Sequence, residues 1–391
     1  MAREVAVETS EDRRASASSL PLQRAVLGYF LLLLAFVPVT QLAVELSGGR
    51  PLQELDVFRR WPTTDRISAY ERALEKNSTV AEFVRRRLQW VGLVALRAGN
   101  QKAVVGAGWT LFYRPGLDSV LRPGFMGSPD AEGHPVAAIV AFRDALAARG
   151  SALMLLVAPG KEAVYPEWLW PGYEQAGGPA VNPDMESFTR EMAARGIAVI
   201  DPTALLWSHK ADGDLYLRHD THWTPEGLAL VADKVARHVP ADLHGDAEMA
   251  LEQSPQSAPG DLLDMLQLPA WSTPLRRQTV VARRVVDAAS GAPVEFDKAS
   301  PVVLLGDSFT NIYSLPEMGW GAHAGLGEQL AYRLRRPVDV VALNDGGVNT
   351  ARATLARRPE PLAGKRLVIW QFAARDLVVS NGRWQRIAVG R

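Results

Sequence analysis

The sequence PVVLLGDSF (301–309) joins an uninterrupted apolar run to a glycine, an aspartate and a serine. Apolar runs of this length, bounded by proline and glycine, are typical of parallel strands that are covered on both faces. A residue that follows such a strand directly lies at the carboxyl edge of the sheet, where α/β proteins place their ligand sites. The stretch therefore predicts a buried strand that presents Ser308 at the start of the next turn.

Similar apolar runs occur elsewhere in the chain and alternate with helical patterns. The expected helices span 136–149, 183–195 and 325–335, and the further expected strands span 152–157, 197–200, 338–343 and 367–370. This alternation predicts an α/β fold with a doubly wound parallel sheet. Between about 240 and 299 the alternation stops. There TVVARRVVD (279–287) and PVEFD (293–297), separated by AASGA, predict an inserted β-hairpin.

The N-terminal part carries one apolar segment that is long enough to cross a bilayer. AVLGYFLLLLAFVPVTQLAV (25–44) contains no charged residue. A helix of that length spans about 30 Å, the thickness of the hydrocarbon core. We expect a transmembrane signal anchor at 25–46 after a cytoplasmic tail at 1–24, with a cleaved signal sequence as the alternative. Arginines on both sides leave only a weak preference for an inside N-terminus.

The rest of the chain divides into a lead-in and a main domain. Residues 47–130 are expected to form a linker and a helical lead-in, with a linker over 47–63 and helical periodicity over 65–96. Short strands with glycine turns are expected within 99–116. The α/β domain is expected to occupy 131–391, interrupted by the insertion at about 240–299.

The composition excludes several classes of function. The 43 Lys and Arg residues balance the 43 Asp and Glu residues, so the chain lacks the polycationic surface of nucleic-acid-binding proteins. We therefore expect no nucleic-acid partner. The chain has no cysteine, which excludes thiol catalysis, disulfides and thiolate zinc sites. It has 11 tryptophans; aromatic clefts often bind sugars, although most tryptophans are packing residues.

DTHWTP (220–225) supplies the groups that a serine nucleophile requires. The spacing of two places Asp220 and His222 on the same side of an extended segment. The carboxylate can then hold the Nδ1–H of the imidazole, which leaves Nε2 free as a general base for Ser308. The alternatives are helix-capping or core roles for Ser308 and His222, and a D-x-H half of a metal site. We expect no metal, because no further ligands cluster nearby.

DTHWT (220–224) and GDSF (306–309), in that order, resemble the alginate O-acetyltransferase group of AlgJ/AlgX-like proteins within the SGNH-hydrolase superfamily. The similarity covers about 60–380. Four further segments resemble that group: GWTLFYRPG (108–116), APGKEAVYPE (158–167), GDLLDML (260–266) and VIWQFAARDL (368–377). Ordinary SGNH enzymes carry the serine block first and a D-x-x-H block last. The resemblance therefore implies an SGNH-like catalytic domain with a circularly permuted motif order.

By this resemblance Ser308 is the nucleophile, His222 the general base and Asp220 the carboxylate that orients it. The oxyanion glycine of the family would fall in VVALNDGGVN (340–349), which makes Gly346 or Gly347 the candidate unless the pair forms a plain turn. The usual asparagine block is not recognisable, and VIWQFAARDL occupies its place. The substitute oxyanion donors are Asn344, Arg375 and Asn311, with a salt bridge as the alternative for Arg375. The substrate-binding candidates are Trp223, Tyr165 and Gln371, with packing as the alternative.

The resemblance implies an O-acetyltransferase that moves an acetyl group through an acetyl-serine onto hydroxyls of an alginate-like exopolysaccharide. No acetyl-CoA signature or phosphate-cradling glycine loop is present, so we expect no cofactor. The expected partners are the polysaccharide acceptor and a membrane-bound O-acyltransferase that donates the acetyl group. The expected location is the inner membrane, single-pass, with the catalytic domain in the periplasm. The alternatives are an SGNH-type acetylesterase and a non-catalytic glycan-binding component.

Overall fold

The computed structural model describes residues 10–48, 61, 63–122, 124–272, 275, 277–344, 347–380 and 383–389. The chain forms two compact units. The first comprises 1–91 together with 269–271, and the second comprises 92–268 together with 272–391.

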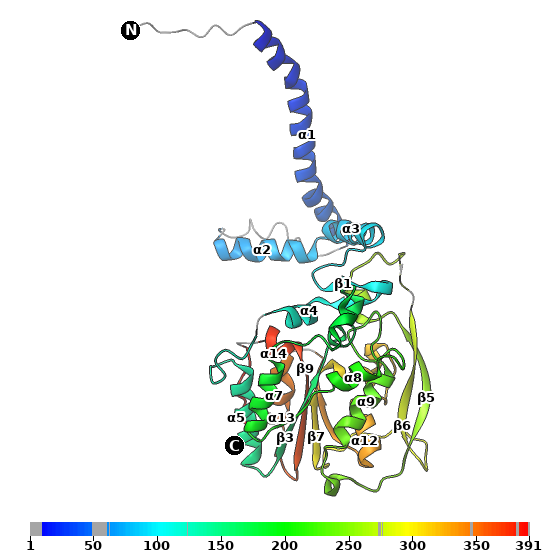
Figure 1. The fold of residues 1–391 in the computed structure, drawn as a ribbon. Coiled ribbons are helices and arrows are strands. Elements are labelled where there is room, and N and C mark those ends of the chain that lie inside the picture. Colours follow the sequence, from blue (N-terminus) through cyan, green and yellow to red (C-terminus); the bar gives the residue numbers. More distant parts are fainter. Residues whose placement is uncertain are drawn as a thin grey trace. The chain divides into compact units, whose positions relative to one another are not determined.

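The N-terminal unit contains the apolar helix that the sequence predicts. α1 (Ser10–Ser47) runs through the whole expected span at 25–46 (Figure 1). Within it, Gln23–Ser47 has a mean hydropathy of 2.1 and is the one helix among the described residues that is long and apolar enough to cross a membrane. Length and composition of this kind fit an anchor and a signal sequence equally.

Two helices replace the single helical stretch expected over 65–96. α2 (Thr64–Asn77) and α3 (Thr79–Leu96) are separated at Ser78, whose Oγ accepts a hydrogen bond from the backbone N–H of Ala81 at 3.2 Å. A serine that caps a first turn in this way starts a new helix. The apolar periodicity continues across Ser78 and therefore conceals the break. Most of the linker predicted at 47–63 lies outside the described residues.

Five parallel strands form the sheet of the second unit. Their order is β4-β3-β9-β7-β8, so the last of the described strands in the chain is the central strand of the sheet. The strands are β3 (Ala152–Ala158), β4 (Ala198–Ile200), β7 (Val302–Gly306), β8 (Asp339–Ala342) and β9 (Leu367–Ala373). The predicted α/β fold with a parallel sheet is confirmed.

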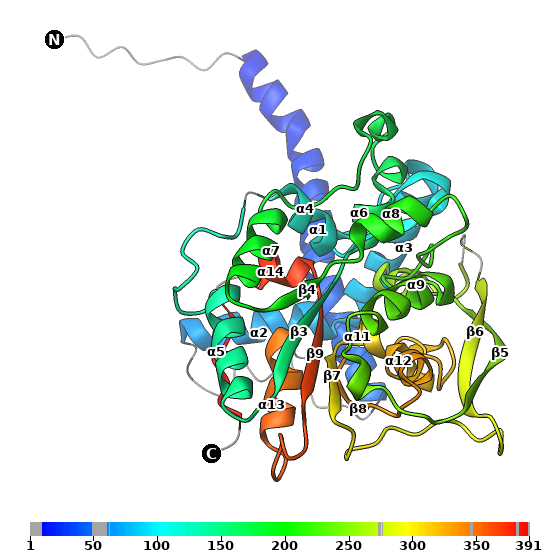
Figure 2. The same ribbon diagram turned by 60° about the horizontal axis from the view of Figure 1, so that its bottom comes forward.

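Alternate side chains of each strand enter two different core layers. In β3, Leu155 lies in one layer and Leu156 in the other, and both are completely buried. Helices cover both faces of the sheet, as Figures 1 and 2 show. One face carries α5 (Pro135–Ala147), α7 (Met185–Ala194) and α13 (Thr350–Ala356), and the other carries α8 (Thr203–His209), α9 (Pro225–Ala236) and α12 (Leu326–Leu334). Burial on both faces explains why the strands read as continuous apolar runs.

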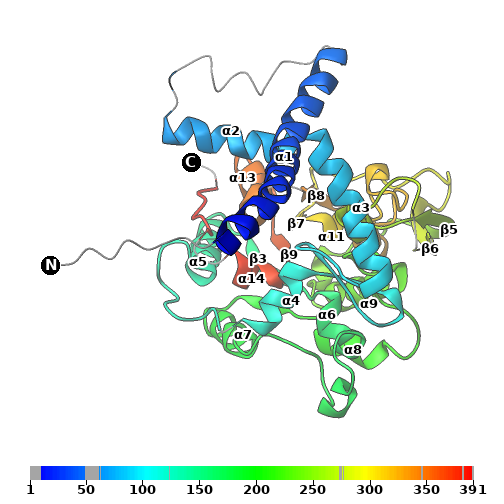
Figure 3. The same ribbon diagram turned by 90° about the horizontal axis from the view of Figure 1, so that it is seen from above.

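Short helices begin where the central strands end. α6 (Lys161–Val164) follows β3, α11 (Ser308–Asn311) follows β7 and α14 (Arg375–Val379) follows β9. In the view of Figure 3, α11 and α14 lie beside the ends of β7 and β9. The carboxyl edge of the sheet therefore carries the GDSF motif. α4 (Arg114–Leu121) and α10 (Asp261–Met265) complete the helices of this unit among the described residues.

Two antiparallel pairs lie outside the parallel sheet. β1 (Ala103–Val105) pairs with β2 (Leu111–Tyr113), inside the region where short strands were expected. β5 (Met249–Ala258) pairs along its full length with β6 (Gln278–Asp287).

The hairpin predicted between β6 and residues 293–297 is present only beside its turn. Residues 293–297 contribute one isolated bridge, between Val286 and Pro293, whereas the ladder of β6 is formed with β5. The turn itself is present, because Asp287 Oδ1 accepts a hydrogen bond from the N–H of Ser290 at 2.8 Å. β5 was not predicted, because its side chains are mostly polar and exposed and because it contains Pro255.

Candidate active site

Ser308 is the first residue of α11 and follows the strand-to-helix turn after β7. Asp307 caps the helix, since its Oδ1 accepts a hydrogen bond from the N–H of Phe309 at 2.8 Å. Gly306 is required at the end of the strand: a Cβ there would lie 2.1 Å from Thr310 Oγ1. The GDSF motif therefore forms a tight turn that only a glycine at its first position allows.

Gln371 of β9 fixes this turn to the central strand. Its Oε1 accepts hydrogen bonds from the N–H of Asp307 at 3.1 Å and from Thr310 Oγ1 at 2.8 Å. The side chain is buried, and its Nε2 has no hydrogen-bond partner among the described residues. Because the backbone N–H of Asp307 only donates, the carbonyl oxygen of the amide must face it.

The DTHWT and GDSF segments meet at the carboxyl edge of the sheet. His222 Nε2 lies 2.8 Å from Ser308 Oγ, and His222 Nδ1 lies 2.6 Å from Asp220 Oδ1. Asp220 and His222 are each 2% exposed. The imidazole also packs edge-on against the ring of Phe309, with 4.7 Å between the ring centroids. The arrangement is that of a hydroxyl, a base and an orienting carboxylate in hydrogen-bonded series.

The carboxylate of Asp220 accepts four N–H groups. Oδ1 accepts the backbone N–H of His222 at 3.1 Å besides its ring, and Oδ2 accepts Trp320 Nε1–H at 2.9 Å and the backbone N–H of Asp261 at 3.0 Å. Burial raises the pKa of Asp220, but the hydrogen bonds from His222 and Trp320 outweigh it and lower the pKa to about 2. Asp220 is therefore ionised at neutral pH.

The pKa of His222 is raised above its ordinary value. Burial lowers this pKa, but the hydrogen bond and charge of Asp220 raise it more, and Asp261 and Asp307 add to the effect. A base with a raised pKa accepts the proton of a serine hydroxyl more readily. The arrangement can thus deprotonate Ser308 and hold the resulting imidazolium beside an anion.

Asp261 supports the loop that carries Asp220 and His222, and no motif in the sequence indicated this role. Its carboxylate accepts hydrogen bonds from the N–H and the hydroxyl of Thr221, both at 2.7 Å. Gly260 allows the close approach: its φ is +94°, and a Cβ there would lie 2.3 Å from the carbonyl oxygen of His219. Burial and the charge of Asp220 raise the pKa of Asp261 to about 6. The segment GDLLDML contains this residue, but no local pattern identified its contact.

The ligand atoms of Asp220, His222 and Asp261 lie within 4.8 Å of one another, close enough to hold a metal ion. Both oxygens of Asp220 and the Nδ1 of His222 are, however, already engaged in the hydrogen bonds described above. A cation at this position would have to displace N–H donors and separate the imidazole from its carboxylate. The donor set therefore fits a hydrogen-bonded triad better than a metal centre.

Two further buried residues that sequence analysis missed hold the loop in place. Trp320, through the bond already described, reaches Asp220 from a position one hundred residues later in the chain. Lys161 Nζ donates to the carbonyl oxygens of Leu111 at 2.7 Å and Arg218 at 3.0 Å. Burial lowers the pKa of Lys161 to about 7, although the charge of Asp220 opposes this effect. Lys161 thereby joins β2 to the segment that leads into Asp220.

The predicted oxyanion donors differ in their surroundings. Gly346 lies outside the described residues, and Gly347 is exposed with a φ of +66°. Asn344 Oδ1 accepts a hydrogen bond from Asn311 Nδ2 at 2.9 Å, while Asn344 Nδ2 contacts Met318 Sδ at 3.1 Å. The side-chain amides of Asn311 and Asn344 therefore link α11 to the loop after β8.

Arg375 lies close to the nucleophile turn. Its guanidinium carbon is 5.7 Å from the centroid of the Phe309 ring and 5.1 Å from that of Tyr113. Burial lowers the pKa of Arg375, but the nearby carboxylates, first Asp376 and then Asp307, raise it more. The side chain therefore brings a permanent positive charge to the edge of the site.

The three predicted substrate-binding residues lie inside the protein. Trp223, Tyr165 and Gln371 are 0%, 2% and 1% exposed. Trp223 packs against Phe309 with 4.8 Å between ring centroids, and Tyr165 accepts the backbone N–H of Leu215 at 2.9 Å. In this structure their side chains are buried and pack beneath the site, as in the packing alternative.

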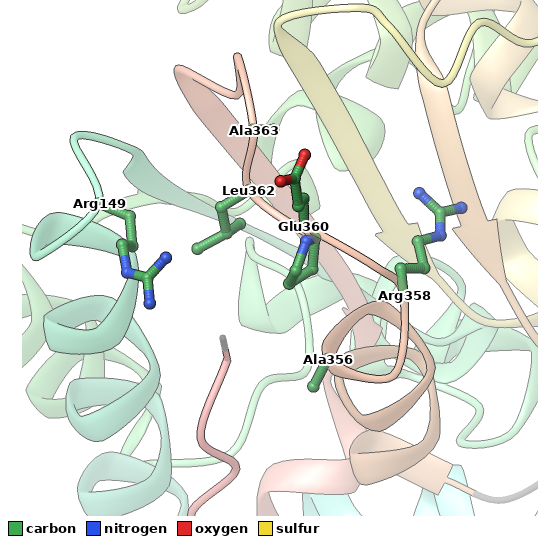
Figure 4. Close-up of a pocket in the computed structure, with 7 residues that line it drawn as sticks. Arg149, Ala356, Arg358, Glu360, Leu362 and Ala363 are labelled. Atoms are coloured by element: carbon green, nitrogen blue, oxygen red, sulfur yellow. The ribbon is translucent and has the colours of Figure 1, made fainter. Parts of the chain in front are cut away.

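A cavity of about 600 Å³ lies at the other end of the sheet (Figure 4). Its lining includes Arg149, which precedes β3, and Arg358 and Glu360, which precede β9. These segments lie at the amino ends of the strands, opposite Ser308. The guanidinium of Arg358 is moreover engaged with Asp339, at 2.8 and 2.9 Å. The cavity is therefore separate from the candidate active site.

Comparison with known proteins identifies relatives of this fold. Residues 125–374 match the family "SGNH hydrolase-like domain, acetyltransferase AlgX". The chain is 32% identical over 190 residues to a probable alginate O-acetylase AlgJ of Pseudomonas syringae pv. tomato, a match covering 46% of this chain and 48% of that protein. The matched region thus spans about half the length of this curated relative.

Solved structures show the same fold. The O-acetyltransferase domain of Pseudomonas putida AlgJ is 25% identical with a TM-score of 0.55, and the match covers 71% of this chain and 93% of that domain. Pseudomonas aeruginosa AlgX is 22% identical with a TM-score of 0.53, covering 72% of this chain and 68% of that chain. The resemblance inferred from the DTHWT and GDSF motifs is confirmed: the chain belongs to the AlgJ/AlgX family of SGNH hydrolase-like acetyltransferases.

Proposed function

We propose that this chain is a polysaccharide O-acetyltransferase that carries the acetyl group on Ser308. The observation that supports the proposal most directly is the series Ser308 Oγ, His222 Nε2, His222 Nδ1 and Asp220 Oδ1, with separations of 2.8 and 2.6 Å. In a family of acetyltransferases, such a series is a nucleophile with its base. An alginate-like acceptor is proposed because curated relatives are named probable alginate O-acetylases.

The first half-reaction transfers the acetyl group to the protein. Ser308 Oγ attacks the acetyl carbonyl while His222 Nε2 takes the hydroxyl proton. The tetrahedral intermediate then collapses, the bond to the donor's leaving oxygen breaks, and His222 returns the proton to that oxygen. Asp220 stabilises the imidazolium between these two transfers.

The second half-reaction repeats these steps with a sugar hydroxyl. His222 takes the proton of that hydroxyl, its oxygen attacks the acetyl-serine, and Ser308 leaves with the proton from His222. The negative oxygen of both intermediates requires donors near Ser308. We assign this role to the backbone N–H of Ser308, with Arg375 and Gly347 as further candidates.

We further propose that α1 anchors the chain in the inner membrane, with residues 1–24 as a cytoplasmic tail and 131–391 as a periplasmic catalytic domain. The apolar stretch Gln23–Ser47 supports this proposal by its length and hydropathy. A membrane-bound O-acyltransferase is the proposed acetyl donor, since an anchored acceptor of acetyl groups would lie beside it.

The test uses the purified full chain, a chromogenic acetyl ester as donor and alginate oligosaccharides as acceptor. We expect acetylated sugar to appear at the expense of free acetate, and mass spectrometry of quenched samples to find acetyl on Ser308. Ser308→Ala should lose both signals, whereas the matched control Ser208→Ala, at an exposed serine of α8, should keep them.

Two results would contradict the proposal. Release of acetate that oligosaccharide does not reduce would identify an acetylesterase with the same triad. Undiminished acetylation by the Ser308→Ala variant would show that Ser308 is not the nucleophile.

A further inference from the structure

The exposed side of α3 is apolar. Four residues between 45% and 65% exposed form this surface: Phe83, Val84, Leu88 and Val91. Their spacings of three and four place them along one side of the helix. A surface helix of a soluble domain normally turns such a stripe toward its core. The residue of α3 that is buried, Leu93, lies on a different side of the helix. The four exposed residues are called the α3 stripe below.

Basic side chains accompany the α3 stripe. Arg85, Arg86 and Arg87 follow one another, and Glu82 is the one acidic residue of the helix. Arg86 pairs with Glu82 at 2.6 Å, and the guanidinium of Arg87 lies 3.3 Å from the centroid of the Phe83 ring. The helix therefore keeps a net positive charge next to its apolar side. This combination is typical of helices that lie on anionic bilayers.

A tryptophan extends the apolar surface. Trp271 belongs to the same compact unit as residues 1–91 and is 64% exposed. Its ring packs edge-on against Trp90 of α3, with 5.2 Å between the centroids. Tryptophan is enriched where membrane and water meet, because its ring is apolar and its N–H is polar.

The last turns of α1 are hydrogen-bonded to the first residue of α3. Gln41 Oε1 accepts hydrogen bonds from the N–H of Thr79 at 2.9 Å and from its hydroxyl at 3.0 Å. Gln41 Nε2 also donates to Glu45 at 3.1 Å, and both of these side chains are buried. α3 therefore begins beside the last turns of the helix that is long enough to cross a membrane.

We propose that α3 is an interfacial helix that lies on an anionic lipid bilayer. The α3 stripe and Trp271 enter the boundary between headgroups and acyl chains, while the arginines bind headgroup phosphates. The occupant of this surface is lipid, because α3 combines exposed apolar side chains with a net positive charge. The helix is also hydrogen-bonded to the apolar helix α1. This inference goes beyond the acyl transfer and does not depend on Ser308.

The absence of cysteine from the sequence allows a direct test. Labelling the introduced cysteine of the Leu88→Cys variant places an environment-sensitive fluorophore on the α3 stripe. Glu82→Cys places it on another side of the same helix and serves as the matched control. Both full-length variants are reconstituted in nanodiscs of phosphatidylethanolamine and phosphatidylglycerol. Quenching is then measured with a lipid-attached spin label and with aqueous iodide.

We expect the probe at Leu88 to lose most of its fluorescence to the lipid quencher and little to iodide, and the probe at Glu82 to do the reverse. Equal iodide quenching at both positions would overturn the proposal. Protection of the Leu88 probe from both quenchers would also overturn it, since a protein would then cover the stripe. In phosphatidylcholine nanodiscs we expect weaker lipid quenching at Leu88; unchanged quenching would refute the role of the arginines. Val84→Glu should reduce lipid quenching of a probe at Val91→Cys, and no reduction would contradict an inserted stripe.

Discussion

Replacing Asp220 by asparagine tests the proposed catalytic series at its buried end. An amide has one acceptor oxygen, whereas the carboxylate of Asp220 accepts four N–H groups. If the new NH₂ faces Trp320 and Asp261, two buried donors lose their acceptor. If it faces His222, one backbone donor loses its acceptor, and the imidazole must turn an unprotonated Nδ1 toward the amide.

The second orientation should prevail, because each buried donor left unsatisfied costs about 1–3 kcal/mol. The imidazole proton then moves to Nε2 and faces Ser308, so His222 no longer accepts the serine proton. In triads, this tautomer lowers kcat by about 10⁴. We expect a loss of that order for Asp220→Asn, with little change in KM.

The assay is acetyl transfer to oligosaccharide, measured as kcat and KM with the chromogenic donor. Asp264→Asn is the matched control, because Asp264 is an exposed residue of the same α10 segment that reaches Asp220. We expect it to retain the activity of the unmodified chain. If Asp220→Asn stays within tenfold of that activity while folding normally, Asp220 does not orient the base and the proposed series is refuted.

Three further predictions follow from the surroundings of the site and from the core. Because His222 must be neutral to accept a proton and its pKa is raised above the ordinary value of 6.5, kcat/KM should fall as pH drops through that raised pKa; a midpoint of the acid limb at or below 6.5 would contradict the raised pKa. Asp261→Asn keeps groups able to bond Thr221 but removes a carboxyl whose pKa rises from 3.8 to about 6, so its ionised form costs about 3 kcal/mol of folding free energy. We expect a higher Tm for this variant at pH 8 and a much smaller gain at pH 4, with an equal gain at both pH values as the contrary result. Gln371→Leu leaves the N–H of Asp307 without its acceptor and should lower the free energy of unfolding by about 1–3 kcal/mol, which urea titration measures against Gln385→Leu as the exposed control.

The sequence predicted the sheet because its strands are buried on both faces. PVVLL and ALMLLV are continuous apolar runs whose length and bounding proline and glycine residues are typical of parallel strands. The same reasoning placed Ser308 at the carboxyl edge. β5 was not predicted, because its exposed polar residues and Pro255 give no pattern that is typical of a buried strand.

The meeting of Ser308 with His222 was predictable from chemistry, since a serine nucleophile requires a base. The remaining support was not, because it depends on tertiary contacts. Trp320 and Asp261 reach Asp220 from segments 100 and 41 residues away in the chain. Nothing in the composition around either residue distinguishes it from a packing tryptophan or an exposed acid.

The buried positions of Trp223 and Tyr165 illustrate a similar limit. Their proximity to the motifs in the chain suggested a cleft, but the number of tryptophans in a sequence does not reveal which faces they occupy. The structure places both side chains in the core layer that contains Phe309. An aromatic residue that is close to such a motif in the sequence can therefore pack beneath the histidine as readily as it can bind a sugar.

The central position of β9 determines when the proposed active site can assemble during synthesis of the chain. β9 lies between β3 and β7, yet it is the last of the described strands in the order of synthesis. Until residue 373 has emerged, β7 has no neighbouring strand that connects it to β3, and Gln371 is not available to hydrogen-bond the turn that precedes Ser308. A nascent or truncated chain that ends before β9 therefore lacks the strand on which assembly of the proposed active site depends.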